Sequence, residues 1–143
     1  MPDAFEAGTL NLPGIIGLNE GLSYIESVGM KNIHNHELAL TKTFLEGLRS
    51  ITGINIIGKQ DIQDRTAVVS ITIDGMDPAS IAYELESTYH IMTRVGLHCA
   101  PRAHQTLGTY PEGTVRFSFG YANTHKDVES ALSALNTIVK SSK

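Results

Sequence analysis

Apolar residues in the first third of the chain recur every three or four positions, the spacing of one face of an amphipathic helix. One such stretch covers residues 15–28 and stops at Gly29, and a second covers about residues 33–51 and stops at Gly53. Their apolar positions are Ile15, Leu18, Leu22 and Ile25 in the first, and Leu38, Leu45 and Leu48 in the second. Glycine commonly ends a helix, and proline suits its first turn, as Pro13 does here. The pattern predicts two consecutive helices behind a short extended arm.

The pattern then changes to short runs rich in β-branched residues, which are typical of strands. Residues 54–58 and 67–73 are two such runs. The polar residues 59–65 between them suit a turn, so the two strands should pair as a hairpin.

The second half of the chain alternates helices and strands. Asp77 followed by proline provides a helix cap and a first turn, and this third helix should end near His90. Residues 91–95 form a predicted strand, and residues 96–113 form a loop long enough to be functional. Residues 115–119 form the last strand, after which a Thr-x-x-Asp sequence opens a closing helix.

This order of elements predicts an α+β fold, in which a small, mostly antiparallel sheet of about four strands carries helices on one face. Side chains alternate along a strand, so Val115, Phe117 and Phe119 should face the helices. Arg116 and Ser118 should then lie on the opposite, open face. A sheet face that is open and carries an arginine usually contacts another molecule or another part of a protein.

The composition of the chain mainly excludes certain locations and partners. With 143 residues, 41% of them hydrophobic, the chain is long enough for one domain over residues 1–143. Its single cysteine cannot form an internal disulfide, and it shows no signal segment or membrane-length apolar run, so we expect a cytoplasmic location and no membrane partner. The net charge is −4 and the 11 basic residues are scattered, so we expect no nucleic-acid partner.

The lone cysteine, Cys99, lies between Gly96 and Pro101, where a strand should give way to a loop. Two interpretations stay open: a small buried hydrophobe, or a nucleophile whose pKa is lowered by Arg94 and His98. Arg116, inside an apolar strand, must find an anion or point to water, and its planar fork suits a carboxylate. The alternative for Arg116 is a surface ion pair, and the alternative for His98 is a solvated loop position.

A metal site receives little support from the histidines. Those considered with the cysteine are His34, His36, His98 and His104. His34 and His36 are two residues apart and point to different sides of a helix, and the chain has no Cys-x-x-Cys or His-Glu-x-x-His pattern. We therefore predict no metal ligand.

Three separated motifs occur in residues 5–18, 94–101 and 115–124, and they read FEAGTLN followed by PGIIGL, RVGLHCAP, and VRFSFGYANT. Their order and spacing resemble the carboxy-terminal part of the class V aminotransferase and cysteine desulfurase family, closest to its selenocysteine lyase-like, short-loop desulfurases. The resemblance implies the small domain of a fold-type I pyridoxal phosphate enzyme. Such an enzyme removes sulfur from L-cysteine, giving alanine and a cysteine persulfide.

The resemblance also implies roles for individual residues. Cys99 looks like the nucleophile that forms the persulfide. Arg116 looks like the arginine that holds the substrate carboxylate, and Arg94 looks like a second active-site arginine. His98, in the same segment as Arg94, joins the expected substrate-binding set.

Gly8 and Thr9 resemble the pair that, in the family dimer, reaches the cofactor phosphate of the neighbouring subunit. The cofactor lysine of the family stands in a Ser/Thr-x-His-Lys setting, which none of the six lysines here shares. We therefore expect an isolated small domain, without the large lysine-bearing domain and inactive alone. The whole enzyme would be a homodimer, and a protein could accept its sulfur.

Two departures from the family pattern keep alternatives open. Leu10 replaces the proline usual after Thr9, and residues 102–113 are not the usual short-loop sequence. The alternatives are a class V aminotransferase or a selenocysteine lyase. A separate alternative is a non-enzymatic α+β binding module that shares only the fold and in which Cys99 is structural.

Overall fold

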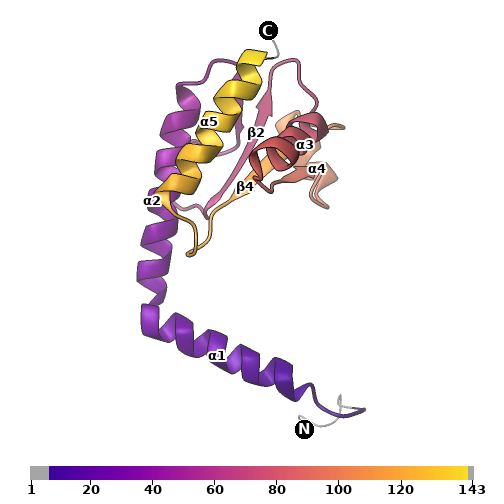
Figure 1. The fold of residues 1–143 in the computed structure, drawn as a ribbon. Helices are drawn as coiled ribbons and strands as arrows, with labels where there is room; N and C mark the ends of the chain where they lie inside the picture. The colour runs from indigo at the N-terminus through magenta and orange to yellow at the C-terminus, as the bar shows by residue number, and fades with distance from the viewer. Residues whose placement is uncertain (1–6, 142–143) are drawn as a thin grey trace. The chain divides into compact units, whose positions relative to one another are not determined.

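The computed structural model describes residues 7–141 of the chain (Figure 1). Its contacts divide the chain after Asn35 into two compact units, and each unit is described by itself. The single domain expected over the whole chain stays a prediction. No helix in the described residues is long and apolar enough to cross a membrane.

The first unit contains helix α1 (Leu12–Val28), which confirms the first predicted helix. The Asn11 side chain caps its start by accepting a hydrogen bond from the Gly14 amide at 3.1 Å. Its end is closed at Gly29, whose amide donates to the Ile25 carbonyl at 2.8 Å. None of the α1 side chains is buried.

Helix α2 (Met30–Arg49) confirms the second predicted helix, although it begins at Met30 rather than near residue 33 and ends before residue 51. Only its second half enters the core of the larger unit. The buried residues of α2 are Leu40, Thr41, Phe44, Leu45 and Leu48.

The larger unit is built on a sheet of four strands in the order β1-β2-β4-β3, every neighbouring pair antiparallel. The strands are β1 (Ile54–Ile57), β2 (Val68–Ile73), β3 (Arg94–Gly96) and β4 (Thr114–Ser118). The hairpin predicted between the first two strands is confirmed by the pairing of β1 with β2. The α+β class and the mostly antiparallel sheet are confirmed as well.

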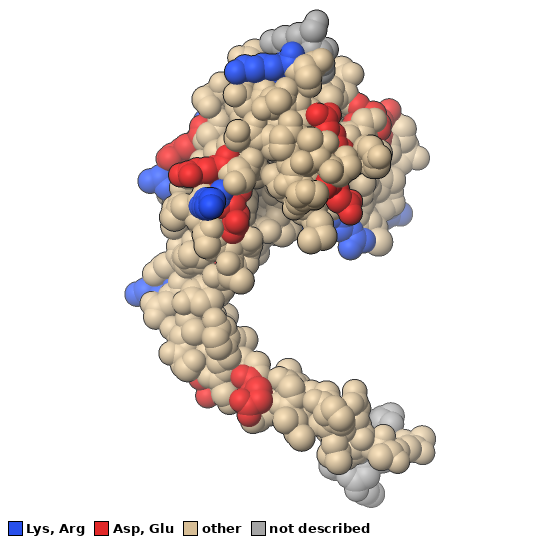
Figure 2. Space-filling view, viewed as in Figure 1, with Lys and Arg blue, Asp and Glu red and all other residues tan. Residues whose placement is uncertain are grey.

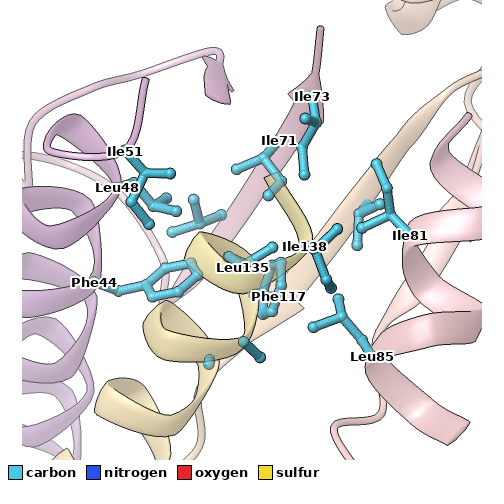
Figure 3. Close-up of a cluster of buried hydrophobic side chains, with 14 of the residues drawn as sticks. Phe44, Leu48, Ile51, Ile71, Ile73, Ile81, Leu85, Phe117, Leu135 and Ile138 are labelled. Carbon is cyan, nitrogen blue, oxygen red and sulfur yellow. The ribbon is translucent and has the colours of Figure 1, made fainter. Parts of the chain in front are cut away.

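One face of the sheet is covered by α2, α3 (Pro78–Tyr89) and α5 (His125–Ser141), as Figures 1 and 3 show. Side chains alternate along β4 as predicted: Val115 and Phe117 are buried beneath the helices, and Ser118 is exposed. The Phe44 ring lies 4.9 Å from the Phe117 ring, between centroids. This core holds the sheet so that the opposite, open face is free to carry polar side chains.

Both predicted helix caps of the larger unit are present. Asp77 accepts a hydrogen bond from the Ser80 amide at 2.9 Å and opens α3. Asp127 accepts from the Thr124 amide at 2.8 Å at the start of α5. These backbone hydrogen bonds lower the pKa of both carboxyl groups.

Two predictions around the third strand are wrong in part. The strand expected over residues 91–95 shrinks to Arg94–Gly96, because the Ile91 amide donates to the Leu85 carbonyl at 2.9 Å and closes the end of α3. The loop expected over residues 96–113 contains a helix, α4 (Pro101–Leu107). The proline and glycine that suggested a loop are instead the first turn and the C-cap of this helix.

Candidate active site

Cys99 lies at an exposed corner between β3 and α4. His98 and Cys99 have φ values of +51° and +61°, a left-handed conformation that non-glycine residues rarely adopt. The turn is closed by the Ala100 amide, which donates to the Leu97 carbonyl at 2.8 Å. The interpretation of Cys99 as a buried hydrophobe is therefore wrong, because its side chain faces solvent.

Arg94 and Arg116 lie directly opposite each other on β3 and β4, so both project from the open face of the sheet. Like charges directly opposite in an antiparallel pair destabilise it unless an anion lies between them. In residues 7–141 no carboxylate comes within 4.0 Å of either guanidinium, and the ion pair formed there joins Lys42 to Glu46. The surface ion pair considered for Arg116 is thus absent from this part of the chain.

Two buried polar atoms on the same face also have no hydrogen-bond partner among the described residues. They are Nε of Arg116 and Oγ1 of Thr114, which is fully buried. Thr114 lies opposite Gly96, two residues before Arg116 on β4. Unpaired buried donors are rare in folded proteins, and a bound carboxylate would satisfy the Arg116 group.

His98 joins the Cys99 corner to β3. Its Nε2 lies 3.0 Å from the Arg94 carbonyl oxygen, which can only accept, so Nε2 carries the proton. Burial lowers the pKa of His98, the bond to the Arg94 carbonyl opposes that effect, and electrostatic interactions with Arg116, His104 and Arg94 lower the pKa further. His98 is therefore neutral at neutral pH, and any substrate contact must use its Nδ1.

Two further residues lie near this corner: Thr109, which the sequence did not reveal, and His104 on α4, which the sequence offered only as a possible metal ligand. Both are buried, and His104 Nδ1 lies 2.7 Å from Thr109 Oγ1. The His104 ring also lies 5.7 Å from the His98 ring, between centroids. Only their spacing across the end of a helix could have suggested the contact.

Gly8 and Thr9 belong to the first unit, and both are exposed. Phe5 and Glu6 of the same motif lie outside the described residues. The structure therefore does not test the phosphate-binding role expected for Gly8 and Thr9.

Charge is mixed on the larger unit. Figure 2 shows basic and acidic side chains interspersed on the face that it draws, with no massed basic patch there. Within the described residues no three His, Cys, Asp or Glu side chains gather in a way that could hold a metal ion.

The comparison with protein families decides the relationship. The model of the class V aminotransferases matches residues 1–131. The chain belongs to this family. The resemblance seen in the three sequence motifs is thereby confirmed.

Relatives within the family are named as cysteine desulfurases. The chain is 37% identical over 129 residues to a probable cysteine desulfurase of Methanothermobacter thermautotrophicus, covering 90% of this chain and 32% of the relative. It is 38% identical over 140 residues to one of Pyrococcus abyssi, covering 98% and 34%. The chain thus spans about a third of the length of these relatives.

A solved structure agrees with this relationship. The apo structure of a cysteine desulfurase from Thermococcus onnurineus NA1 matches with a TM-score of 0.90 and 37% identity, covering 98% of this chain and 34% of that one. The cysteine desulfurase CsdA of Escherichia coli matches with a TM-score of 0.82 and 26% identity, covering 94% and 32%. The fold is that of a part of a class V enzyme.

Proposed function

We propose that this chain supplies the sulfur-accepting thiol and the carboxylate clamp of a pyridoxal phosphate-dependent cysteine desulfurase. One observation carries the proposal: Arg94 and Arg116 stand opposite each other without a carboxylate partner in the described residues, on strands that flank the exposed Cys99 corner. Burial is the main reason for the lowered pKa of His98, next to Cys99, and the charges of Arg116 and Arg94 contribute to it in the same direction.

In the proposed reaction, Arg116 and Arg94 bind the carboxylate of L-cysteine and turn its sulfur toward Cys99. The Cys99 thiolate attacks that sulfur, an S–S bond forms, and the carbon–sulfur bond of the substrate breaks. The electron pair stays with the substrate carbon, which takes up a proton. L-cysteine and the Cys99 thiol thus become L-alanine and a Cys99 persulfide.

Pyridoxal phosphate, when bound, withdraws electrons from the amino acid and so weakens its bonds. Exposed Gly8 offers a backbone that approaches a phosphate without steric hindrance, and Thr9 adds a hydroxyl, so the two fit that group. No lysine here has the family's Ser/Thr-x-His-Lys setting, so we propose that this chain does not form the covalent link to the cofactor.

The homodimer and the protein that accepts sulfur belong to this proposal too. A persulfide-forming thiol must stay reduced, which supports the cytoplasmic location expected from the sequence. Among class V activities, a sulfur-accepting role is favoured over amino transfer because Cys99 is exposed and follows β3, the strand that carries Arg94 opposite Arg116.

The experiment compares how fast iodoacetate and iodoacetamide alkylate the chain. Cys99 is the only cysteine, so the label reports on one thiol. Iodoacetate carries a carboxylate and iodoacetamide does not, so the ratio of the two rates measures positive charge near the sulfur. A charge about 6 Å away in water changes such a ratio about threefold, most clearly at low ionic strength.

Arg116→Gln and Arg94→Gln should each lower the iodoacetate-to-iodoacetamide ratio about threefold. Lys42→Gln is the matched control, because it removes one exposed positive charge from α2, on the covered side of the sheet. Its ratio should equal that of the wild type. If neither arginine substitution changes the ratio, the thiol and the guanidinium groups do not share a site and the proposal fails.

A further inference from the structure

The two histidines near the Cys99 corner form a chain of contacts that the proposed reaction does not itself use. The rings of His98 and His104 lie 5.7 Å apart and are tilted by 53°. His104 is only 6% exposed, although histidine is a polar residue. A buried imidazole normally has a hydrogen-bond partner that fixes its orientation.

Thr109 is that partner, and it holds His104 twice. Its Oγ1 lies 2.7 Å from His104 Nδ1, and its amide donates to the His104 carbonyl at 2.9 Å. Thr109 in turn accepts a hydrogen bond from the Gly113 amide at 2.7 Å. The ring of His104 is therefore fixed to the turn that leads into β4.

This turn touches β3 at the end that leads into the corner. A Cβ atom placed on Gly113 would lie 2.2 Å from the carbonyl carbon of Gly96, so the two backbones are in direct contact. His98 connects the corner back to β3, because its Nε2 donates to the Arg94 carbonyl at 3.0 Å. The segment from β3 to β4 is thus closed by side-chain and backbone contacts around Cys99.

The corner needs such support. His98 and Cys99 are consecutive non-glycine residues with φ near +50° to +60°, and this conformation persists only where the surroundings impose it. Two contacts of His98 help to impose it: the bond to the Arg94 carbonyl and the ring contact with His104.

We propose that His104, fixed by Thr109, is a positioning residue that holds the His98–Cys99 corner so that the thiol stays beside Arg94 and Arg116. This inference rests on the proposed function. A purely structural role for His104 and Thr109 would change the stability of the fold but not the electrostatic surroundings of the thiol in the molecules that are folded.

The iodoacetate-to-iodoacetamide ratio separates these two roles. Thr109→Val removes the hydroxyl but keeps the shape, and it should lower the ratio about threefold, toward the value of an arginine variant. Thr109→Ser keeps the hydroxyl and should restore the ratio. Thr106→Val is the matched control, because it makes the same change on α4 at an exposed hydroxyl that donates to the Arg102 carbonyl within its own helix.

His104→Asn provides a second route. Its amide can still reach Thr109, but the ring contact to His98 is lost, so the ratio should fall here as well. Far-UV circular dichroism and the urea midpoint establish which variants are folded under the conditions of alkylation.

Folded Thr109→Val and His104→Asn chains that keep the wild-type ratio overturn the positioning role and leave the proposed function standing. A wild-type ratio equal to that of Arg116→Gln and Arg94→Gln overturns both. If neither variant folds, ¹⁵N NMR of the wild-type imidazoles decides. The proposal requires the His104 ring to be hydrogen-bonded at Nδ1, and a His104 Nδ1 without such a bond would overturn it.

Discussion

The contact between Gly113 and Gly96 makes a sharp test of how the Cys99 segment is held. Gly113 has φ +82°, and an added Cβ would lie 2.2, 2.3 and 2.7 Å from the carbonyl carbon, the oxygen and the Cα of Gly96. Carbon atoms in contact normally lie about 3.5 to 4 Å apart. Gly113→Ala must therefore push the two backbones apart by about 1 Å or more.

The cost follows from what that displacement breaks. Alanine in a left-handed conformation costs about 1–2 kcal/mol. Gly96 pairs with Thr114 at the end of β3, which has only three residues, so separation removes one of its three pairs. With one or two backbone hydrogen bonds lost at about 1 kcal/mol each, we expect Gly113→Ala to lower the free energy of unfolding by about 3 kcal/mol.

Gly108→Ala is the matched control. Gly108 also has a left-handed φ, +71°, but nothing lies within 4 Å of its added Cβ. It should lose only the conformational part, about 1–2 kcal/mol. The difference between the two variants isolates the contact with Gly96.

Urea unfolding followed by far-UV circular dichroism measures both values, and an unchanged slope with denaturant shows that the two-state comparison holds. Gly113→Ala should also lower the iodoacetate-to-iodoacetamide ratio of Cys99, since the contact closes the segment that carries the thiol. A Gly113→Ala chain no less stable than Gly108→Ala would refute the idea that this contact anchors β3.

Three further predictions concern the core, the surface and pH. Phe44→Ala should cost about 3–5 kcal/mol in urea unfolding, because the ring is fully buried against Phe117 and Phe119, and Phe44→Leu should cost less. Glu46→Gln should change stability by less than about 0.5 kcal/mol, because its pair with Lys42 is exposed, and a larger loss would mean that the pair matters to the fold. Because the pKa of His98 is lowered below its ordinary 6.5, the unfolded chain binds a proton there that the folded chain does not, so stability should rise with pH through the window below about 6.5. His98→Asn should flatten that rise in urea midpoints measured from about pH 5 to 8, and an unchanged slope would contradict the pKa direction.

The sequence was most informative where periodicity and capping agree. Asp77 before a proline and a Thr-x-x-Asp pair each opened a helix where predicted, because these caps depend on residues close in sequence. The loop predicted after α3 was partly wrong because that prediction also depended only on residues close in sequence. A proline and a glycine such as Pro101 and Gly108 occur in loops and also at the two ends of a helix. The helix between them has seven residues, which is too short for a helical periodicity to be recognised.

The candidate site was predictable only in part. Alternation along one strand was enough to place Arg116 on the open face. That Arg94 lies directly opposite depends on the register between β3 and β4, which is set by the whole sheet. The contact of His104 with Thr109 and His98 depends on how α4 folds back, and the sequence offers for it only the five-residue spacing of His104 and Thr109.

The left-handed backbone at Cys99 affects which substitutions at this position would stabilise the protein. Glycine would fit that φ better than cysteine does, so Cys99→Gly should make the folded chain more stable while it removes the sulfur. Variants chosen only for heat resistance would thus tend to lose the thiol that we propose accepts sulfur. A library of variants screened for both heat resistance and a reactive thiol should retain cysteine at position 99 and gain stability through substitutions at other positions.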